Sequence, residues 1–266
     1  MRVVGVLFVS ILVTLTFLSL DLKNEKERIL ADRYKVIKVN GQILFQQNKS
    51  QMKSGDFFVS GTLLSFATKQ SRAALVSKTK GRFVISPSSK GQVKIIPAAN
   101  NVSSRAGALI NLIDMKNHFS GDYLVIGDME LEIGEQAFPQ NDSNFFYLTY
   151  KHNGELIRKK LGINGNMLVF NKDDIFKVDG KAIPVVKREM TLLYREGKSS
   201  KVINTFSPVF PNQSELKAEI QIILDEFSDE NSDFKIEEIT AYLNEFYGKP
   251  QKDNLAVWLN MEFDLN

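Results

Sequence analysis

The stretch at residues 36–87 restricts the fold of this 266-residue chain more than any other part of the sequence. It contains short apolar runs of strand length, and the residues between these runs are rich in Gly, Ser, Lys and Thr. Regular spacing of short strands and turn residues is typical of a small β-barrel or β-sandwich. The expected strands are residues 36–39, 43–45, 57–59, 63–66, 73–76 and 82–85.

Two glycines in this stretch predict turns. Asn40 and Gly41 separate the first two strand-length runs. Asn-Gly is the commonest type I′ turn, because both residues tolerate a positive φ and the turn matches the twist of the strands. The sequence therefore predicts a hairpin at Asn40-Gly41. Gly55, which precedes Asp56, indicates a second backbone position with φ above zero.

The same residues resemble the FecR-like β-domain of bacterial envelope proteins. The V-x-V-x-G-x-I opening of that domain is carried by Ile37, Val39, Gly41 and Ile43, with isoleucine in place of the first valine. The other matching pieces are Gly55-Asp56, Leu64-Ser65-Phe66, residues 73–76 and residues 81–87. The resemblance covers about a fifth of the chain. It implies a periplasmic β-module that serves signalling or scaffolding.

Family members that regulate sigma factors carry a cytoplasmic segment before a membrane helix. Only Met1 and Arg2 precede the apolar run here, so direct anti-sigma activity is not expected.

Residues 3–20 form an apolar run of eighteen residues without a charge. At about 1.5 Å per residue, a helix of this length nearly spans the hydrocarbon core of a bilayer. Phe17 lies two residues before Ser19, so the pair of small residues that marks a signal-peptide cleavage site is missing there. We expect residues 1–20 to be an uncleaved signal anchor, with a cleaved signal peptide as the alternative. Residues 21–33 form a charged linker. The expected location is the bacterial inner membrane, single pass and facing the periplasm, or a secreted or periplasmic location after cleavage.

The rest of the chain predicts a second β-rich domain and a helical tail. The β-module is expected at residues 34–100, a linker helix at 101–122, the second domain at 123–212 and an acidic helical tail at 213–266. Asn153-Gly154, Asn164-Gly165 and Asp179-Gly180 are hairpin signals in the second domain. Its expected strands include residues 129–133, 145–150, 155–161, 167–170, 175–178, 183–186, 190–194 and 202–206. The predicted fold is mainly β with a helical C-terminal tail: a small FecR-like β-module plus a second antiparallel β-sandwich.

Three amphipathic helices are expected in the tail. Ser214 is the expected N-cap of the first, whose apolar stripe includes Leu216, Ile220 and Ile223. The second runs through residues 236–246, and the third contains Leu255, Trp258 and Leu259. Such stripes pack within the same molecule or form a docking surface for a partner.

The net charge of +3 is unevenly distributed along the chain. Residues 21–100 contain 15 Lys and Arg against 5 Asp and Glu, whereas residues 214–266 contain 4 against 13. A basic module joined to an acidic tail predicts an anionic surface as one partner and a basic protein as another, although solvated faces or mutual attraction explain the same pattern.

The sequence does not assign a catalytic, cofactor-binding or metal-binding residue. The chain has no cysteine, and its two histidines, His118 and His152, lack companions at metal-ligand spacing. Glu130 and Glu132 share one face of a predicted strand, where a solvated face is the simpler interpretation. Gly197-Lys198-Ser199 lacks the earlier glycine of a phosphate-binding loop. Four Ser-x-x-Lys matches begin at Ser50, Ser77, Ser214 and Ser232, but no Lys-Thr-Gly accompanies them.

These observations favour a non-enzymatic, exported envelope protein that acts as a binding, scaffold or signalling component. Its expected partners are other envelope proteins, an anionic surface at the basic module and the membrane through residues 3–20. No nucleic acid and no cofactor are expected. The alternative is an envelope hydrolase with a serine or carboxylate site that the sequence does not reveal.

Overall fold

The computed structural model describes residues 33–88, 93–98 and 108–265 of the chain. Its fold is mainly β, with several antiparallel sheets and a helical C-terminal region, as predicted. The predicted membrane segment at 1–20, nearly all of the linker at 21–33 and the start of the linker helix lie outside the described residues. The chain divides into two compact units. Of the described residues, one unit comprises 33–88 and 93–97 together with 222–228, and the other comprises the rest.

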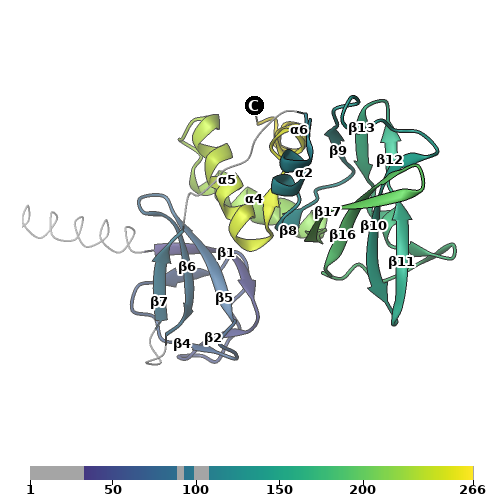
Figure 1. Ribbon diagram of the computed structural model, residues 1–266. Coiled ribbons are helices and arrows are strands. Elements are labelled where there is room, and N and C mark those ends of the chain that lie inside the picture. Colours follow the sequence, from purple (N-terminus) through teal and green to yellow (C-terminus); the bar gives the residue numbers. More distant parts are fainter. Residues whose placement is uncertain (1–32, 89–92, 99–107, 266) are drawn as a thin grey trace, which may run out of the picture. The chain divides into compact units, whose positions relative to one another are not determined.

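The first unit contains the β-module, defined here as residues 33–97. Its strands are β1 (Arg33–Asn40), β2 (Ile43–Phe45), β3 (Phe57–Val59), β4 (Leu64–Phe66), β5 (Arg72–Ser77), β6 (Gly81–Pro87) and β7 (Val93–Pro97). A five-stranded sheet has the order β3-β1-β5-β6-β7, and β2 pairs with β4 in a separate two-stranded sheet (Figure 1). All pairings in the module are antiparallel. The predicted strands are therefore confirmed to within a few residues.

Alternating side chains build the core of the module. Tyr34 and Val36 of β1 face the same interior as Phe58 of β3 and Leu75 of β5. In β5, Ala73–Ser77 are all buried, so this central strand is covered on both faces, as expected for a continuous apolar run. Residues 222–228 belong to this unit, and within it Glu226 Oε1 accepts a hydrogen bond from the backbone nitrogen of Lys78 at 2.9 Å.

The predicted hairpin at Asn40-Gly41 is wrong. β1 pairs with β3 and β5, whereas β2 pairs with β4, so the chain passes from one sheet to another at this point. Gly41 has a φ of +79°, but Asn40 is the last residue of β1 and does not share the positive φ that a type I′ turn requires. The glycine is required by close packing instead. A Cβ at Gly41 would lie 2.7 Å from Ser71 Oγ. The positive φ predicted for Gly55 is confirmed at +88°.

The second unit contains three sheets. Its strands are β8 (Gly121–Leu124), β9 (Met129–Glu132), β10 (Asn144–His152), β11 (Glu155–Lys160), β12 (Gly162–Asn164), β13 (Met167–Phe170), β14 (Lys177–Val178), β15 (Lys181–Ala182), β16 (Met190–Glu196), β17 (Ser199–Val209) and β18 (Lys249–Pro250). The largest sheet has the order β11-β10-β16-β17-β8-β18, a second has the order β12-β13-β9, and β14 pairs with β15. Their inward side chains, which include Tyr123, Phe146, Phe170 and Phe206, form a core together with Phe119, which follows the helix at 112–118.

Most pairings in this unit are antiparallel, but β8 is an exception. It runs parallel to β17 on one side and to β18 on the other. Parallel neighbours need long crossover connections, and here the connections contain the other sheet strands or the tail helices. The tail therefore contributes a strand to the sheet of the second β-rich region.

Two of the three hairpin signals named for the second unit are confirmed at the predicted residues, and the third is displaced. Asn153 and Gly154 have φ of +50° and +85°, and Asp179 and Gly180 have +48° and +77°, as type I′ turns require. Asn164 pairs with Met167, so the third turn consists of Gly165 and Asn166 and is shifted by one residue from the prediction.

The predicted strands at 175–178 and 183–186 are mostly wrong. A short helix, α3 (Lys172–Ile175), replaces the start of the first, because the side chain of Asn171 caps it by accepting from Asp174 N at 2.9 Å. Only β14 and β15 pair around Asp179-Gly180. Pro184 has no backbone N–H, which prevents a regular ladder in the second run.

The helices are α2 (Leu112–His118), α3, α4 (Gln213–Glu226), α5 (Ser232–Phe246) and α6 (Lys252–Phe263). Asn212, and not Ser214, caps α4, since Asn212 Oδ1 accepts from the backbone nitrogens of Ser214 at 3.0 Å and Glu215 at 3.2 Å. The predicted apolar stripes of the tail helices are buried, apart from Leu224 and Ile236, which are half-buried. In the described part of the chain, no helix combines the length and the apolar character needed to cross a bilayer.

The side chain of Asn254 joins α6 to the edge of β9. Its Oδ1 accepts from Glu130 N at 3.2 Å, and its Nδ2 donates to Glu130 O at 2.8 Å. The carboxamide thus satisfies both backbone groups of Glu130, as a neighbouring strand would. Further along the same edge, the backbone nitrogen of Leu109 donates a hydrogen bond to Glu132 O at 2.9 Å. This edge is therefore blocked against pairing with another chain.

Candidate binding surface

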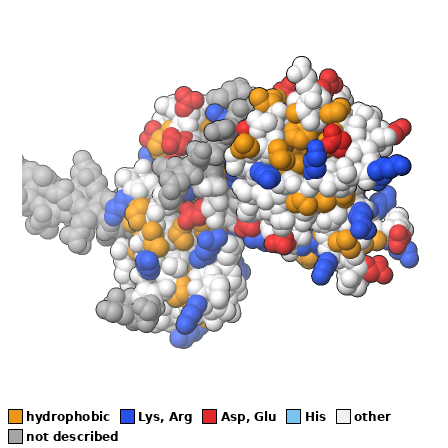
Figure 2. Space-filling view, viewed as in Figure 1, with side chains coloured by type: hydrophobic (Ala, Val, Ile, Leu, Met, Phe, Trp, Pro, Cys, Tyr) orange, Lys and Arg blue, Asp and Glu red, His pale blue; other side chains and the backbone are white. Residues whose placement is uncertain are grey.

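The β-module is strongly basic. Residues 33–97 contain twelve Lys and Arg but a single acidic residue, Asp56. The Asp56 carboxylate accepts a hydrogen bond from Lys53 N at 2.7 Å, so it has a structural role in the turn before β3. The exposed basic side chains are Arg33, Lys49, Lys53, Lys69, Lys78, Lys80 and Lys94. They lie mainly in turns and at strand ends, and Figure 2 shows blue Lys and Arg side chains on the face of the module that is turned to the viewer.

Arg82 is different from these side chains. It begins the apolar part of β6, opposite Val76 of β5, and only 6% of its surface is exposed. A buried guanidinium needs partners inside the protein. Arg82 is therefore part of the structure of the module and not of its binding surface.

Two basic and two apolar side chains share one face of the β1–β3 ladder. Arg33 pairs with Val59, and Lys35 pairs with Phe57. Directly opposed residues lie on the same face of a sheet, as do alternate residues along a strand. We call these four residues the β1–β3 patch. Tyr34 and Phe58, which lie between them in sequence, face the core.

The apolar members of the β1–β3 patch are open to solvent. Phe57 is 46% exposed and Val59 is 41% exposed, because β3 is an edge strand of the five-stranded sheet. The guanidinium carbon of Arg33 lies 3.3 Å from the ring centroid of Phe57. This cation–π contact holds a positive charge directly over exposed aromatic surface.

Buried ionisable groups cluster in the tail. Glu219 of α4 is buried, and its Oε2 accepts hydrogen bonds from the hydroxyls of Tyr242 at 2.7 Å and Tyr247 at 2.5 Å. Burial and the Glu219 carboxylate raise the pKa of both tyrosines well above 10, so they remain hydrogen-bond donors. Sequence reasoning missed this cluster. Glu219 interrupts the apolar stripe between Leu216 and Ile223, and that was the available signal.

His118 is a core residue. Its Nε2 lies 2.5 Å from the hydroxyl of Tyr123, which is also 3.6 Å from the sulfur of Met129. Burial lowers the pKa of His118 from 6.5 to about 4, and the charge of Lys249 acts in the same direction. The imidazole is therefore neutral at pH 7. His152 ends β10, far from His118 in the chain, and pairs with Glu155 at a hairpin.

Glu130 and Glu132 face solvent on β9, as the alternation predicts. Asn164 Nδ2 donates to Glu130 Oε1 at 3.3 Å, and Asn166 Nδ2 donates to Glu132 Oε1 at 3.1 Å. These amides support the strand pair. Among the described residues, no group of three or more His, Asp or Glu side chains is arranged to hold a metal ion.

The serines of the Ser-x-x-Lys matches take part in local structure. Ser50 Oγ donates to Asn48 Oδ1, and Ser214 Oγ donates to Asn212 Oδ1, both at 2.7 Å. Ser77 is buried at the end of β5, with its Oγ 3.5 Å from Thr79 Oγ1. Ser232 is the first residue of α5, which Asn231 caps.

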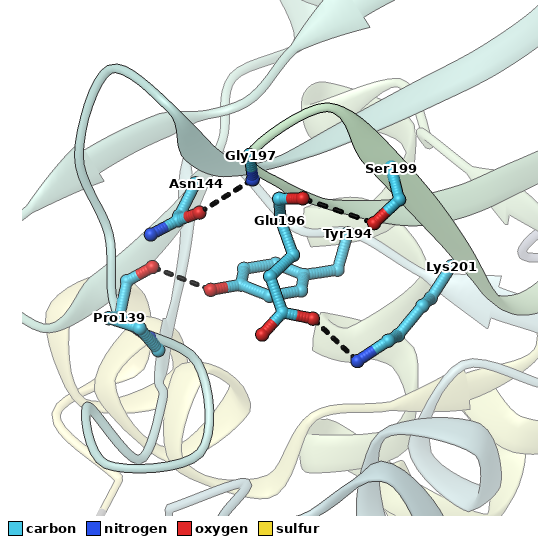
Figure 3. A network of polar contacts seen from close by, with 7 residues as sticks. All are labelled: Pro139, Asn144, Tyr194, Glu196, Gly197, Ser199 and Lys201. Carbon is cyan, nitrogen blue, oxygen red and sulfur yellow. Dashed lines mark hydrogen bonds and ion pairs between the residues drawn. The ribbon is translucent and has the colours of Figure 1, made fainter.

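Gly197-Lys198-Ser199 forms the turn between β16 and β17. The side chain of Asn144 accepts from Gly197 N at 2.9 Å, and Lys201 forms an ion pair with Glu196 at 2.5 Å (Figure 3). The hydroxyl of Tyr194 donates to Pro139 O at 2.7 Å. These contacts fix the tip of the hairpin and leave the glycine nitrogen bonded within the protein.

Comparison of the chain with protein-family models, with curated proteins and with solved structures found no match.

Proposed function

We propose that this protein is a non-enzymatic, exported component of the cell envelope that acts by binding, as a scaffold or signalling element. The observation that carries the proposal is the charge of the β-module, in which basic residues outnumber acidic residues by twelve to one. Exposed Lys and Arg side chains in turns produce a long-range positive potential that attracts acidic partners. The FecR-like pattern of residues 36–87 and the apolar run at 3–20 support an envelope location.

The contacts of the polar groups also support a binding role. Glu219, His118 and the serines discussed above are engaged in hydrogen bonds that stabilise helices, turns or the core. Lys49, Lys53 and Lys69 of the module are exposed outside the strands, where an acidic partner can reach them. We expect the module to bind an anionic surface and the tail to contact other envelope proteins.

Crosslinking in cells tests this function. Since the chain has no cysteine, a photo-crosslinker is attached to Lys53→Cys in the full chain. We expect discrete crosslinked products, and we expect Lys49→Glu with Lys69→Glu to reduce them about tenfold, because each reversal weakens a screened attraction. Lys151→Glu with Lys172→Glu makes the same change in net charge in the second unit and should leave the products in place.

Two outcomes would contradict the proposal. Equal losses in both double variants would show that net charge, and not the module, governs association. Turnover of an envelope substrate by the purified protein, abolished by alanine at Ser50, Ser77, Glu130 or Glu132, would show that the protein is a hydrolase.

A further inference from the structure

We infer that the β1–β3 patch binds the headgroup region of an anionic phospholipid bilayer. The inference deepens the proposed function and rests on it, since it names the anionic surface that the module contacts. The four side chains of the patch combine the two features that interfacial binding requires. Phe57 and Val59 offer apolar surface, and Arg33 and Lys35 offer positive charge on the same face.

The geometry of the patch suits an interface between water and lipid. Exposed aromatic and aliphatic side chains flanked by Lys or Arg enter the boundary between headgroups and acyl chains, while the charges remain among the lipid phosphates. The contact of Arg33 with the Phe57 ring holds a positive charge next to the apolar surface that would enter the lipid. Phe57 and Val59 lie on an edge strand, and their side chains are exposed at that edge of the sheet.

The sequence places this patch next to the predicted membrane segment. The chain enters the β-module at Arg33, which is itself a member of the patch. Residues 21–32 separate it from the apolar run at 3–20, and twelve residues span at most about 40 Å. A tether of this length keeps the module at a high local concentration above the bilayer, so a weak interaction is sufficient for contact.

Charge complementarity selects anionic over zwitterionic lipid. Basic residues near an anionic bilayer each add attraction that acts within a Debye length of the surface. The module contributes many such residues and a single acidic residue, whose carboxylate is bonded to the Lys53 backbone. The contact should therefore depend on both lipid charge and salt.

A fluorescent reporter tests the inference with the full chain. An environment-sensitive fluorophore is attached to Phe57→Cys, and the protein is reconstituted with vesicles of phosphatidylcholine alone or mixed with phosphatidylglycerol. We expect a blue shift and an increase in emission only with the anionic vesicles, reversed by high salt. Arg33→Glu with Lys35→Glu should weaken the response by roughly tenfold or more.

A matched label separates this contact from general proximity. Gln70 is exposed and precedes β5, whose first residue, Arg72, pairs with Asn40 at the opposite end of β1 from Arg33. A fluorophore at Gln70→Cys should therefore show no shift. Circular dichroism checks that the Arg33→Glu, Lys35→Glu variant is folded. If it is not, a salt titration of the protein labelled at residue 57, with Arg33 and Lys35 intact, tests whether the response depends on charge.

The remaining outcomes overturn the inference. No shift at residue 57 while the protein floats with the vesicles would show that the module stands away from the bilayer. An equal shift with both lipid mixtures, or at both label positions, would exclude recognition of anionic headgroups by this patch. Because the vesicles contain no other protein, these results are independent of the crosslinking test of the proposed function.

Discussion

At the residue scale, the buried ionisable groups of the second unit contribute to stability in a pH-dependent way. The His118 imidazole is enclosed by aromatic side chains, with Phe119 and Tyr123 at ring-centroid distances of 5.0 and 5.2 Å. A charged imidazolium in this position would be poorly solvated. The folded protein therefore favours the neutral imidazole, and protonation of His118 opposes folding.

The lowered pKa of His118 predicts a loss of stability in acid. The unfolded chain binds a proton near pH 6.5, whereas the folded protein does so only near pH 4. Stability is therefore complete above pH 6.5 and falls as the pH decreases towards 4, by about 3 kcal/mol for this group. We expect the urea midpoint, followed by the fluorescence of Trp258, to fall more between pH 7 and 4.5 in the unmodified protein than in His118→Gln.

Carboxylates titrate in the same pH range, so the contribution of His118 is the difference between the midpoint losses of the unmodified protein and His118→Gln. Identical losses in both would show that His118 is not the responsible group. If His118→Gln does not fold, NMR titration of the His118 ring replaces it. The chemical shifts of this ring should then keep their neutral-form values until the pH approaches about 4.

At the element scale, strands defined by local alternation were predictable and non-local arrangements were not. The strands of the β-module and the tail helices follow from apolar periodicity and turn residues. The Asn40-Gly41 hairpin failed because a local turn signal does not show that Gly41 must approach Ser71. The strand expected at 175–178 failed because Asn171 caps a helix at that point. The parallel contacts of β8 depend on segments far apart in sequence.

The same limits apply to the candidate binding surface. Its basic charge was visible in the sequence. The β1–β3 patch was not, because it depends on the register that places Phe57 opposite Lys35 across a connection of many residues. The cluster around Glu219 requires two helices to meet, and only its position on an apolar stripe hinted at burial.

The connection from α5 to β18 gives a test of the parallel arrangement. Gly248 has a φ of +114°, and a Cβ there would collide with the carbonyl group of Asp122 in β8. Gly248→Ala should therefore cost more than about 2 kcal/mol, because strain adds to steric overlap. Gly127→Ala is the matched control. Its φ is +63° with nothing within 4 Å of the added carbon, so about 1 kcal/mol is expected.

Thermal unfolding monitored at Trp258 compares these two variants. Trp258 belongs to α6 in the same unit, and it is the single tryptophan of the chain. A melting temperature for Gly248→Ala equal to that of Gly127→Ala would show that β18 does not approach β8 as closely as described.

At the scale of the whole molecule, the parts of the chain differ in physical character. An apolar run is followed by a basic β-module, and the second unit ends in an acidic tail whose core is stabilised by Glu219 and two tyrosines. We propose that the module lies outside the cytoplasm and remains attached to a membrane.

The most direct test of that claim is the intact mass of the protein after labelling in cells. The full chain carrying Lys69→Cys is treated in intact cells with a maleimide that cannot cross the inner membrane, and the membrane fraction is then analysed by mass spectrometry. We expect a mass that corresponds to all 266 residues plus one label. A labelled protein whose mass is lower by that of about twenty residues would indicate cleavage and a soluble exported protein. A protein that is labelled only after lysis would contradict export, and with it the proposed function.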